Sequence, residues 1–427
     1  MSSLLIQGGR VIDPHSQFDA VADVYIADTR IIAIGAKPDG FTPERTLNAS
    51  GQVVAPGIVD LCARLREPGF EYKATLESEL AAAAAGGVTT LLCPPDTAPV
   101  LDEPGLVNML RQRAKASHGA RVHPMGALTE GLKGQAITEM GVLTDAGCIA
   151  FSQADRQIED TQVMLRAMQY AATFGHIVVL RCEDHYLARD GVAHEGVIAA
   201  RLGLAPIPAL AETVALERAL SVARATGVRL HITRLSTAGS VALIRNAKAS
   251  GLQVTCDVAV HHLHLTDMDI GFFDSRARVV PPFRSAADKA ALRQGLRDGT
   301  IDAIVSDHAP VDEDEKLIPF GEAEPGVTAL ELILPLTLKW AAEEKLALNQ
   351  AWSRVSSSPA QAMGMAVGQI AVGAKADLIV FDPTTWWTLE PAALRSQGHN
   401  TPFMGLELQG RALHTIVDGA LTFSRSV

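Results

Sequence analysis

Residues 56–69 read Pro56-Gly57-Ile58-Val59-Asp60-Leu61-Cys62-Ala63-Arg64-Leu65-Arg66-Glu67-Pro68-Gly69. The stretch joins a short apolar run, typical of a buried strand, to a polar segment that follows it. Similar runs recur along the chain near residues 53–60, 88–93, 121–127, 147–151, 177–181, 228–233, 252–257 and 302–306. Helical patterns separate most of them, near 75–85, 159–173, 210–225, 240–249 and 286–296. Eight alternations of strand and helix predict a (β/α)8 barrel of the TIM type, in which chemistry sits where the strands end.

The two ends of the chain have a different pattern. Residues 3–49 alternate short strand-like segments with turns, and residues 377–382 and 415–419 repeat this style. That spacing is typical of hairpins. We therefore expect a small β-sandwich built from residues 1–52 plus 366–427, around a barrel of residues 53–365.

Composition limits the classes of partner. The chain has 427 residues and a net charge of −11, which argues against nucleic acid or an anionic membrane surface. Its apolar runs are shorter than the roughly 18 residues that a membrane span needs, and its first residues lack a signal-peptide pattern. The five scattered cysteines predict free thiols. Together these features predict a cytoplasmic location.

Seven segments spread along the chain carry a family resemblance. They are residues 56–69, 94–100, 126–134, 183–185, 236–240, 306–310 and 400–405. As a set they resemble dihydroorotase of the bacterial type-I kind, within the amidohydrolase superfamily, over nearly the whole chain. More closely, the chain resembles the non-catalytic dihydroorotase homologues that associate with aspartate carbamoyltransferase.

The resemblance implies where a metal would be held. Active relatives bind zinc through a histidine pair after strand one, a carboxylate or carbamylated lysine after strand four, a histidine each from strands five and six, and an aspartate from strand eight. The matching positions here, strand four apart, are Cys62, Arg64, Arg181, Arg234 and Asp307. A guanidinium has no lone pair to donate to a metal. We therefore expect no zinc and a former pocket filled by arginines paired with nearby carboxylates from the set Asp155, Glu183, Asp184 and Asp307.

A different metal site is the open alternative. It would use Cys62, His185 and Asp307, since catalytic zinc needs three protein ligands. Strand alternation turns Cys182, His231 and His308 away from the mouth. The pair His262 and His264 forms a new His-x-His after strand seven, for which we favour a loop or supporting role.

Substrate-side positions are mixed. Arg66 matches the arginine with which relatives grip a substrate carboxylate, although an ordinary ion pair is the plain alternative. Asp96 stands where an asparagine would assist it, and Arg284 closes a segment that keeps part of a family pattern. Asp307 keeps the position of the family's general base, without the metal that would activate water.

The resulting functional prediction is a catalytically inactive subunit. It would assemble with aspartate carbamoyltransferase catalytic chains, stabilise them in pyrimidine synthesis and self-associate as a dimer; this partner comes from the resemblance alone. Two alternatives stay open: a metal-dependent cyclic-amide hydrolase with a remodelled metal site, and a protein that senses an anion through the arginine pocket. The acidic stretch 311–315 is either a solvated loop or a docking surface.

Overall fold

The computed structural model describes residues 3–425 and centres on eight parallel strands that surround one axis. In chain order they are β6 (Ile58–Asp60), β7 (Val88–Cys93), β8 (Arg121–Ala127), β9 (Ala150–Ser152), β10 (Ile177–Leu180), β13 (Arg229–Ile232), β14 (Val254–Ala259) and β15 (Ala303–Val305). Each pairs in parallel with the next. A bridge between Ala63 and His308 joins the segments after the first and last strands, so the barrel is nearly closed. The predicted barrel is confirmed.

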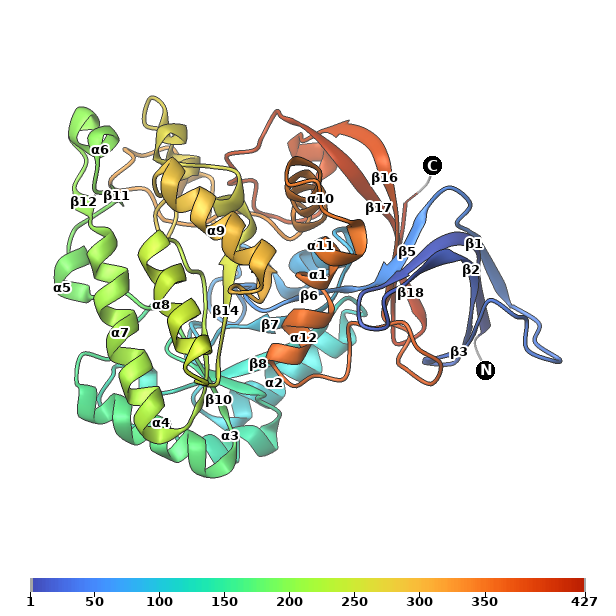
Figure 1. The fold of residues 1–427 in the computed structure, drawn as a ribbon, viewed down its shortest axis with the longest axis horizontal. Coiled ribbons are helices and arrows are strands. Elements are labelled where there is room, and N and C mark those ends of the chain that lie inside the picture. Colours follow the sequence, from blue (N-terminus) through green and yellow to red (C-terminus); the bar gives the residue numbers. More distant parts are fainter. Residues whose placement is uncertain (1–2, 426–427) are drawn as a thin grey trace.

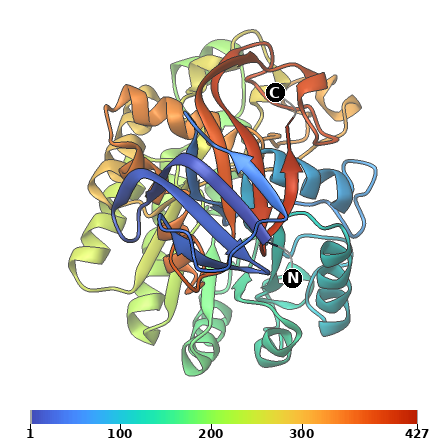
Figure 2. The ribbon, with the colours of Figure 1, turned by 90° about the vertical axis from the view of Figure 1, so that its right-hand side faces the viewer.

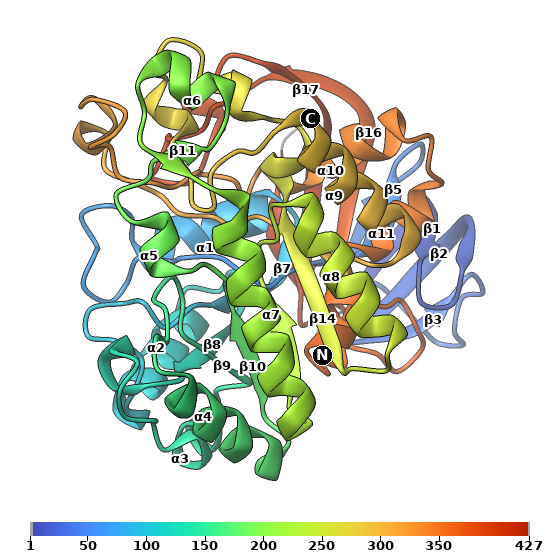
Figure 3. The same ribbon diagram turned by 60° about the vertical axis from the view of Figure 1, so that its left-hand side comes forward.

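Helices cover the outside of the barrel (Figures 1 and 3). The longer ones are α1 (Leu76–Ala85), α2 (Pro104–Ala116), α3 (Met140–Ala146), α4 (Thr161–Phe174), α7 (Ala209–Thr226), α8 (Ala238–Ala249), α9 (Ala286–Asp298) and α10 (Ile333–Glu343). Short helices α5 (His185–Ala188), α6 (Val197–Leu202), α11 (Leu348–Ser353) and α12 (Ser357–Ala362) complete the set, with a two-stranded ribbon of β11 (Ala193–His194) and β12 (Pro206–Ile207). Thr75 and Ser285 close reciprocal capping boxes at α1 and α9, which explains why these helices start where the sequence indicates.

The terminal segments form a second sheet, which Figure 2 shows in front of the barrel. Its order is β18-β17-β16-β5-β1-β2-β3, with β4 paired to β1. The strands are β1 (Ser3–Asp13), β2 (Phe18–Ala27), β3 (Arg30–Ile34), β4 (Arg45–Asn48), β5 (Val53–Pro56), β16 (Leu378–Thr388), β17 (Glu407–Val417) and β18 (Ala420–Ser424). Most of the pairings are antiparallel. A module built from both ends of the chain is therefore confirmed.

The apolar run 53–60 serves both sheets. Its first half, β5, pairs with β1 and β16 in the terminal sheet, and only its second half, β6, enters the barrel. Gly57 lies between them, and a side chain there would meet Thr89 at 2.1 Å. The run therefore needs glycine at the point where the chain passes from one sheet to the other.

The remaining sequence expectations concern cysteines and membranes. All five cysteines are free and buried, as predicted. Within residues 3–425, every helix is too short or too polar to cross a bilayer.

Candidate active site at the barrel mouth

The barrel strands deliver the predicted residues to one place. Cys62 and Arg64 follow β6, Arg181 follows β10, Arg234 follows β13, and Asp307 follows β15. All five side chains are buried. Arg234 and Asp307 have positive φ angles of 59° and 48°. Such a backbone conformation is costly for residues other than glycine and is concentrated at functional sites.

Asp155 is the hub of the cluster. Its carboxylate accepts from Arg64 Nη2 at 2.6 Å and from Arg181 Nε at 2.8 Å, and Arg234 Nη2 donates to it as well. Three guanidinium groups from three strands of the barrel therefore meet on one carboxylate. Arg181 also contacts Glu183, and Arg64 donates to Asp96 at 2.8 Å.

Asp307 lies beside this hub. Its Oδ1 accepts from Arg234 Nη1 at 3.0 Å and from Arg64 Nη1 at 3.3 Å. The thiol of Cys62 is 3.8 Å from the same oxygen. Oδ2 is 4.0 Å from Nε2 of His261, a buried ring with no hydrogen-bond partner on either nitrogen within the described chain. Asp307 is thus held from one side by cations and faces a neutral histidine on the other.

Burial and charge act against each other on the two carboxylates. Burial alone would raise the pKa of Asp155, but the guanidiniums of Arg234, Arg64 and Arg181 outweigh it and hold that pKa far below its usual value. For Asp307, burial dominates and raises the pKa above its usual value, against the opposing effect of Arg234 and Arg64. Burial also raises the pKa of the Cys62 thiol, which disfavours the thiolate.

These residues do not fit the zinc that active relatives hold. Within residues 3–425, no group of three or more histidine, cysteine, aspartate or glutamate side chains is placed to hold a metal ion. Asp155 and Asp307 already accept from guanidiniums, and the remaining candidate, Cys62, is a protonated thiol. Like charges 4 Å apart repel by about 4 kcal/mol at an effective dielectric of 20, so these cations oppose a divalent ion.

The other candidate ligands are engaged elsewhere. His231 contacts Asp257 at 2.8 Å, and His308 contacts Glu79 at 2.6 Å, both in buried pairs. His262 and His264 lie near backbone carbonyls of Pro281 and Leu336, at 3.2 and 2.9 Å. This placement agrees with a supporting role for the new His-x-His pair.

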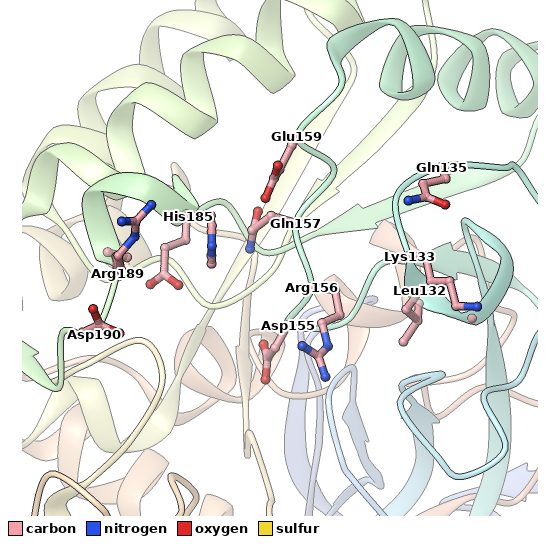
Figure 4. A pocket seen from close by; sticks show the side chains of 13 residues that line it. Leu132, Lys133, Gln135, Asp155, Arg156, Gln157, Glu159, His185, Arg189 and Asp190 are labelled. Carbon is pink, nitrogen blue, oxygen red and sulfur yellow. The ribbon is translucent and has the colours of Figure 1, made fainter.

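His185 and Cys182 also lie apart from the cluster. Cys182 packs in the apolar core between the strands and the outer helices. His185 lines a separate hollow of about 640 Å³ with Arg156, Arg189 and one side of Asp155, shown in Figure 4. The structure therefore does not bring His185 to Cys62.

The substrate-side residues divide into two groups. Arg66 and Asp96 line a hollow of about 350 Å³ at the barrel mouth, together with Arg64, Asp155, Arg234 and Asp307. Arg66 Nε donates to the carbonyl of Pro310, and its Nη2 is 3.7 Å from Glu324. Arg284 is not among the residues that line this hollow, since it donates to Ser236 and to the carbonyl of Ile207.

The sequence did not point to Lys73 and Glu324, which form an ion pair at the rim of the hollow. They lie about 250 positions apart, in the segment before α1 and in the long loop after β15. A partner in a loop without a motif leaves no local signal. The hub, Asp155, did leave one, as the first acidic residue after strand four.

Comparisons with known proteins agree with this geometry. Residues 51–240 match the family described as Dihydro-orotase-like, and residues 200–423 match the Amidohydrolase family. The structure of L-hydantoinase (dihydropyrimidinase) from Arthrobacter aurescens superposes with a TM-score of 0.87 at 24% identity, covering 100% of this chain and 97% of that one. At that identity the likeness shows the fold.

Sequence relatives define the branch more narrowly. A dihydroorotase-like protein from Pseudomonas aeruginosa is 45% identical over 420 residues, which cover 98% of this chain and 99% of the relative. A dihydroorotase from Geobacter sp. (strain M21) is 42% identical over 424 residues, 99% of each chain. The chain belongs to the dihydroorotase-like branch of the amidohydrolase family.

These relatives correct one prediction. The sequence analysis expected a chain that is not an enzyme, because the metal ligands are replaced. Relatives named dihydroorotase match nearly the full chain at 40 to 42% identity, and this points to an active cyclic amidohydrolase. Counting lost metal ligands considered only one way of building the site, and gave no weight to a barrel mouth that keeps an acid and several cations around a hollow.

Proposed function

We propose that this protein is a cyclic amidohydrolase that opens or closes a ring amide bearing an acidic group, with dihydroorotate as the first substrate to test. The observation that carries the proposal is the full-length match to relatives named dihydroorotase. The cationic lining of the mouth hollow supports an anionic substrate, because Arg64, Arg66 and Arg234 all face it.

The chain's own residues suggest separate roles in such a reaction. Asp307 is the buried carboxylate whose pKa is raised by burial, which brings it closer to the range where a carboxyl group can accept and return a proton. Arg64 and Arg234 donate to it and hold it in place. Their remaining N–H groups could meet negative charge that develops on the amide oxygen. No step is assigned to a metal, because the residues do not fit one.

The direct test is turnover by the purified chain of three ring amides: dihydroorotate, hydantoin and dihydrouracil. We expect dihydroorotate to be preferred, because only it carries a carboxylate. The Arg66→Met variant should raise its KM by roughly tenfold or more, the value of one charge-assisted hydrogen bond. Rates equal to those in protein-free buffer for all three rings, with chelated and with zinc-supplemented protein, would refute the proposal.

We further propose that the chain assembles with aspartate carbamoyltransferase catalytic chains. The prediction comes from the sequence resemblance, and one structural observation favours a protein partner: large apolar side chains are exposed on the loops at one end of the barrel, among them Phe272 and Leu317. Mixing the two purified proteins and measuring the mass of the product by light scattering tests it. Self-association as a dimer and a cytoplasmic location stay predictions.

A further inference from the structure

Three segments at one end of the barrel expose apolar side chains. They are α6, the 3-10 turn Asp267–Ile270 with the residues after it, and the loop 311–325 that follows β15. The exposed side chains are Val197, Met268, Phe272, Phe273, Leu317 and Ile318, which we call the loop surface. Phe272 is 99% exposed and Leu317 is 82% exposed. Figures 1 and 3 show α6 at the edge of the barrel away from the terminal sheet.

The loop surface rests on an ordered base. Beneath it Ile270, Ala277 and Phe320 pack in one buried apolar cluster that also includes Ala193 and Ala199. The turn carrying Phe272 therefore shares a small core with α6 and with the loop after β15. Segments that share a core present their outer side chains in a fixed arrangement, which lowers the entropy cost of binding.

Lys316 ties two of the segments together. Its buried ammonium donates to the carbonyls of Ser275 at 3.1 Å, Arg278 at 3.2 Å and Glu324 at 2.6 Å. The hydroxyl of Ser275 donates back to the carbonyl of Lys316. The apolar neighbours Leu317 and Ile318 are consequently turned outward beside a lysine whose charge is turned inward.

The rim of the loop surface is acidic. Asp314, Glu315 and Glu322 are exposed, and in residues 3–425 none of the three forms an ion pair. Lys316 is buried and Arg276 is engaged by Asp274 at 2.8 Å, so these neighbouring cations do not neutralise the rim. Two copies of this rim would repel each other, whereas a surface with basic residues around an apolar centre would match it.

We infer that the loop surface is the docking face for a different protein chain, one that offers an apolar hollow flanked by lysine or arginine. Exposed apolar groups on an ordered base mark interaction sites in soluble proteins. The inference rests on the proposed assembly with aspartate carbamoyltransferase chains and names the face that this assembly uses. It assigns the acidic stretch 311–315 to recognition and Phe272 and Leu317 to the apolar centre of the contact.

Titration of aspartate carbamoyltransferase catalytic chains into this protein, followed by sedimentation velocity, tests the inference. We expect Phe272→Ser combined with Leu317→Ser to weaken the complex by roughly 100-fold or more, since both are anchors. Phe174→Ser is the matched control, because Phe174 is 61% exposed on α4 in a different part of the fold and should leave affinity unchanged. Asp314→Lys with Glu315→Lys should also weaken binding, more strongly at low salt.

Each other outcome overturns the inference. Full affinity in the Phe272 and Leu317 variant, or equal loss in the Phe174 control, would show that the partner binds elsewhere. No complex with the unaltered chain would overturn both the partner and the face. Loss of self-association in the surface variant would assign the face to a second copy. None of these results affects the cyclic amidohydrolase proposal, which is measured on the isolated chain.

Discussion

The barrel mouth and the loop surface lie at the same end of the fold yet have opposite chemical balance. At the mouth, Asp155 and Asp307 both accept from guanidiniums, so buried charge is matched within the chain. On the loop surface, Phe272 and Leu317 meet only water, and the acidic rim has no cations of its own. The comparison teaches that the interior site is complete by itself, whereas the outer surface is complete only with a partner.

Removal of the hub should give the largest effect on stability. Asp155→Asn leaves three buried guanidiniums without their common carboxylate, and breaking a buried pair costs about 3–5 kcal/mol. Because 36% of the Asp155 side chain is exposed, solvent screening reduces the expected loss to about 2–3 kcal/mol. Urea unfolding measures it, with the exposed Asp145→Asn as control. A loss below that of the control would mean that the cluster does not stabilise the barrel.

Removal of one arm of the cluster should cost less than removal of its hub. Arg181→Met leaves Asp155 with Arg64 and Arg234 and puts an apolar side chain in a buried position. We expect a loss of about 1 kcal/mol, because an apolar replacement of a buried charge is often close to neutral. The same unfolding measurement decides it. If Arg181→Met were as damaging as Asp155→Asn, the three arginines would not share one anchor.

Acid should weaken the cluster in a way that the hub explains. Because the folded-state pKa of Asp155 is held below its unfolded value, its stabilisation is present above about pH 4 and is lost as pH falls through the folded pKa. Unfolding free energies measured from pH 7 down to pH 3 should fall more steeply for the unaltered chain than for Asp155→Asn. Parallel curves for the two proteins would contradict this account.

Metal removal should have the smallest effect. Since guanidiniums occupy the positions that hold zinc in relatives, we expect the unfolding temperature to change by less than about 1 °C with a chelator or with added zinc. Arg64→His should not create zinc binding, because Arg181 and Arg234 remain. Metal content by mass spectrometry is the second readout. About one bound zinc per chain, or a stabilisation of several degrees by zinc, would mean that the site rearranges to accept the ion.

Much of the fold could be predicted from the sequence, because the buried runs and helical periods are local signals. The run 53–60 shows the limit: its apolar residues predict one strand, but contacts with β1 and β16 divide it between two sheets. The five residues of the site were located by resemblance, whereas their common anchor on Asp155 depends on side-chain directions that spacing alone does not give. The rim pair Lys73 and Glu324 depends on how a long loop folds back.

The central claim is that the mouth around Asp307 is a working cyclic-amide site, and turnover of dihydroorotate by the unaltered chain and by Asp307→Asn tests it most directly. We predict measurable turnover that falls by at least about 100-fold in the variant, the usual contribution of a group that moves the proton. Asp302→Asn is the matched control, because Asp302 lies just before β15, pairs with Lys248 and is not among the residues that line the mouth hollow. Equal rates for Asp307→Asn and the unaltered chain, or no turnover above buffer by either, would contradict the account.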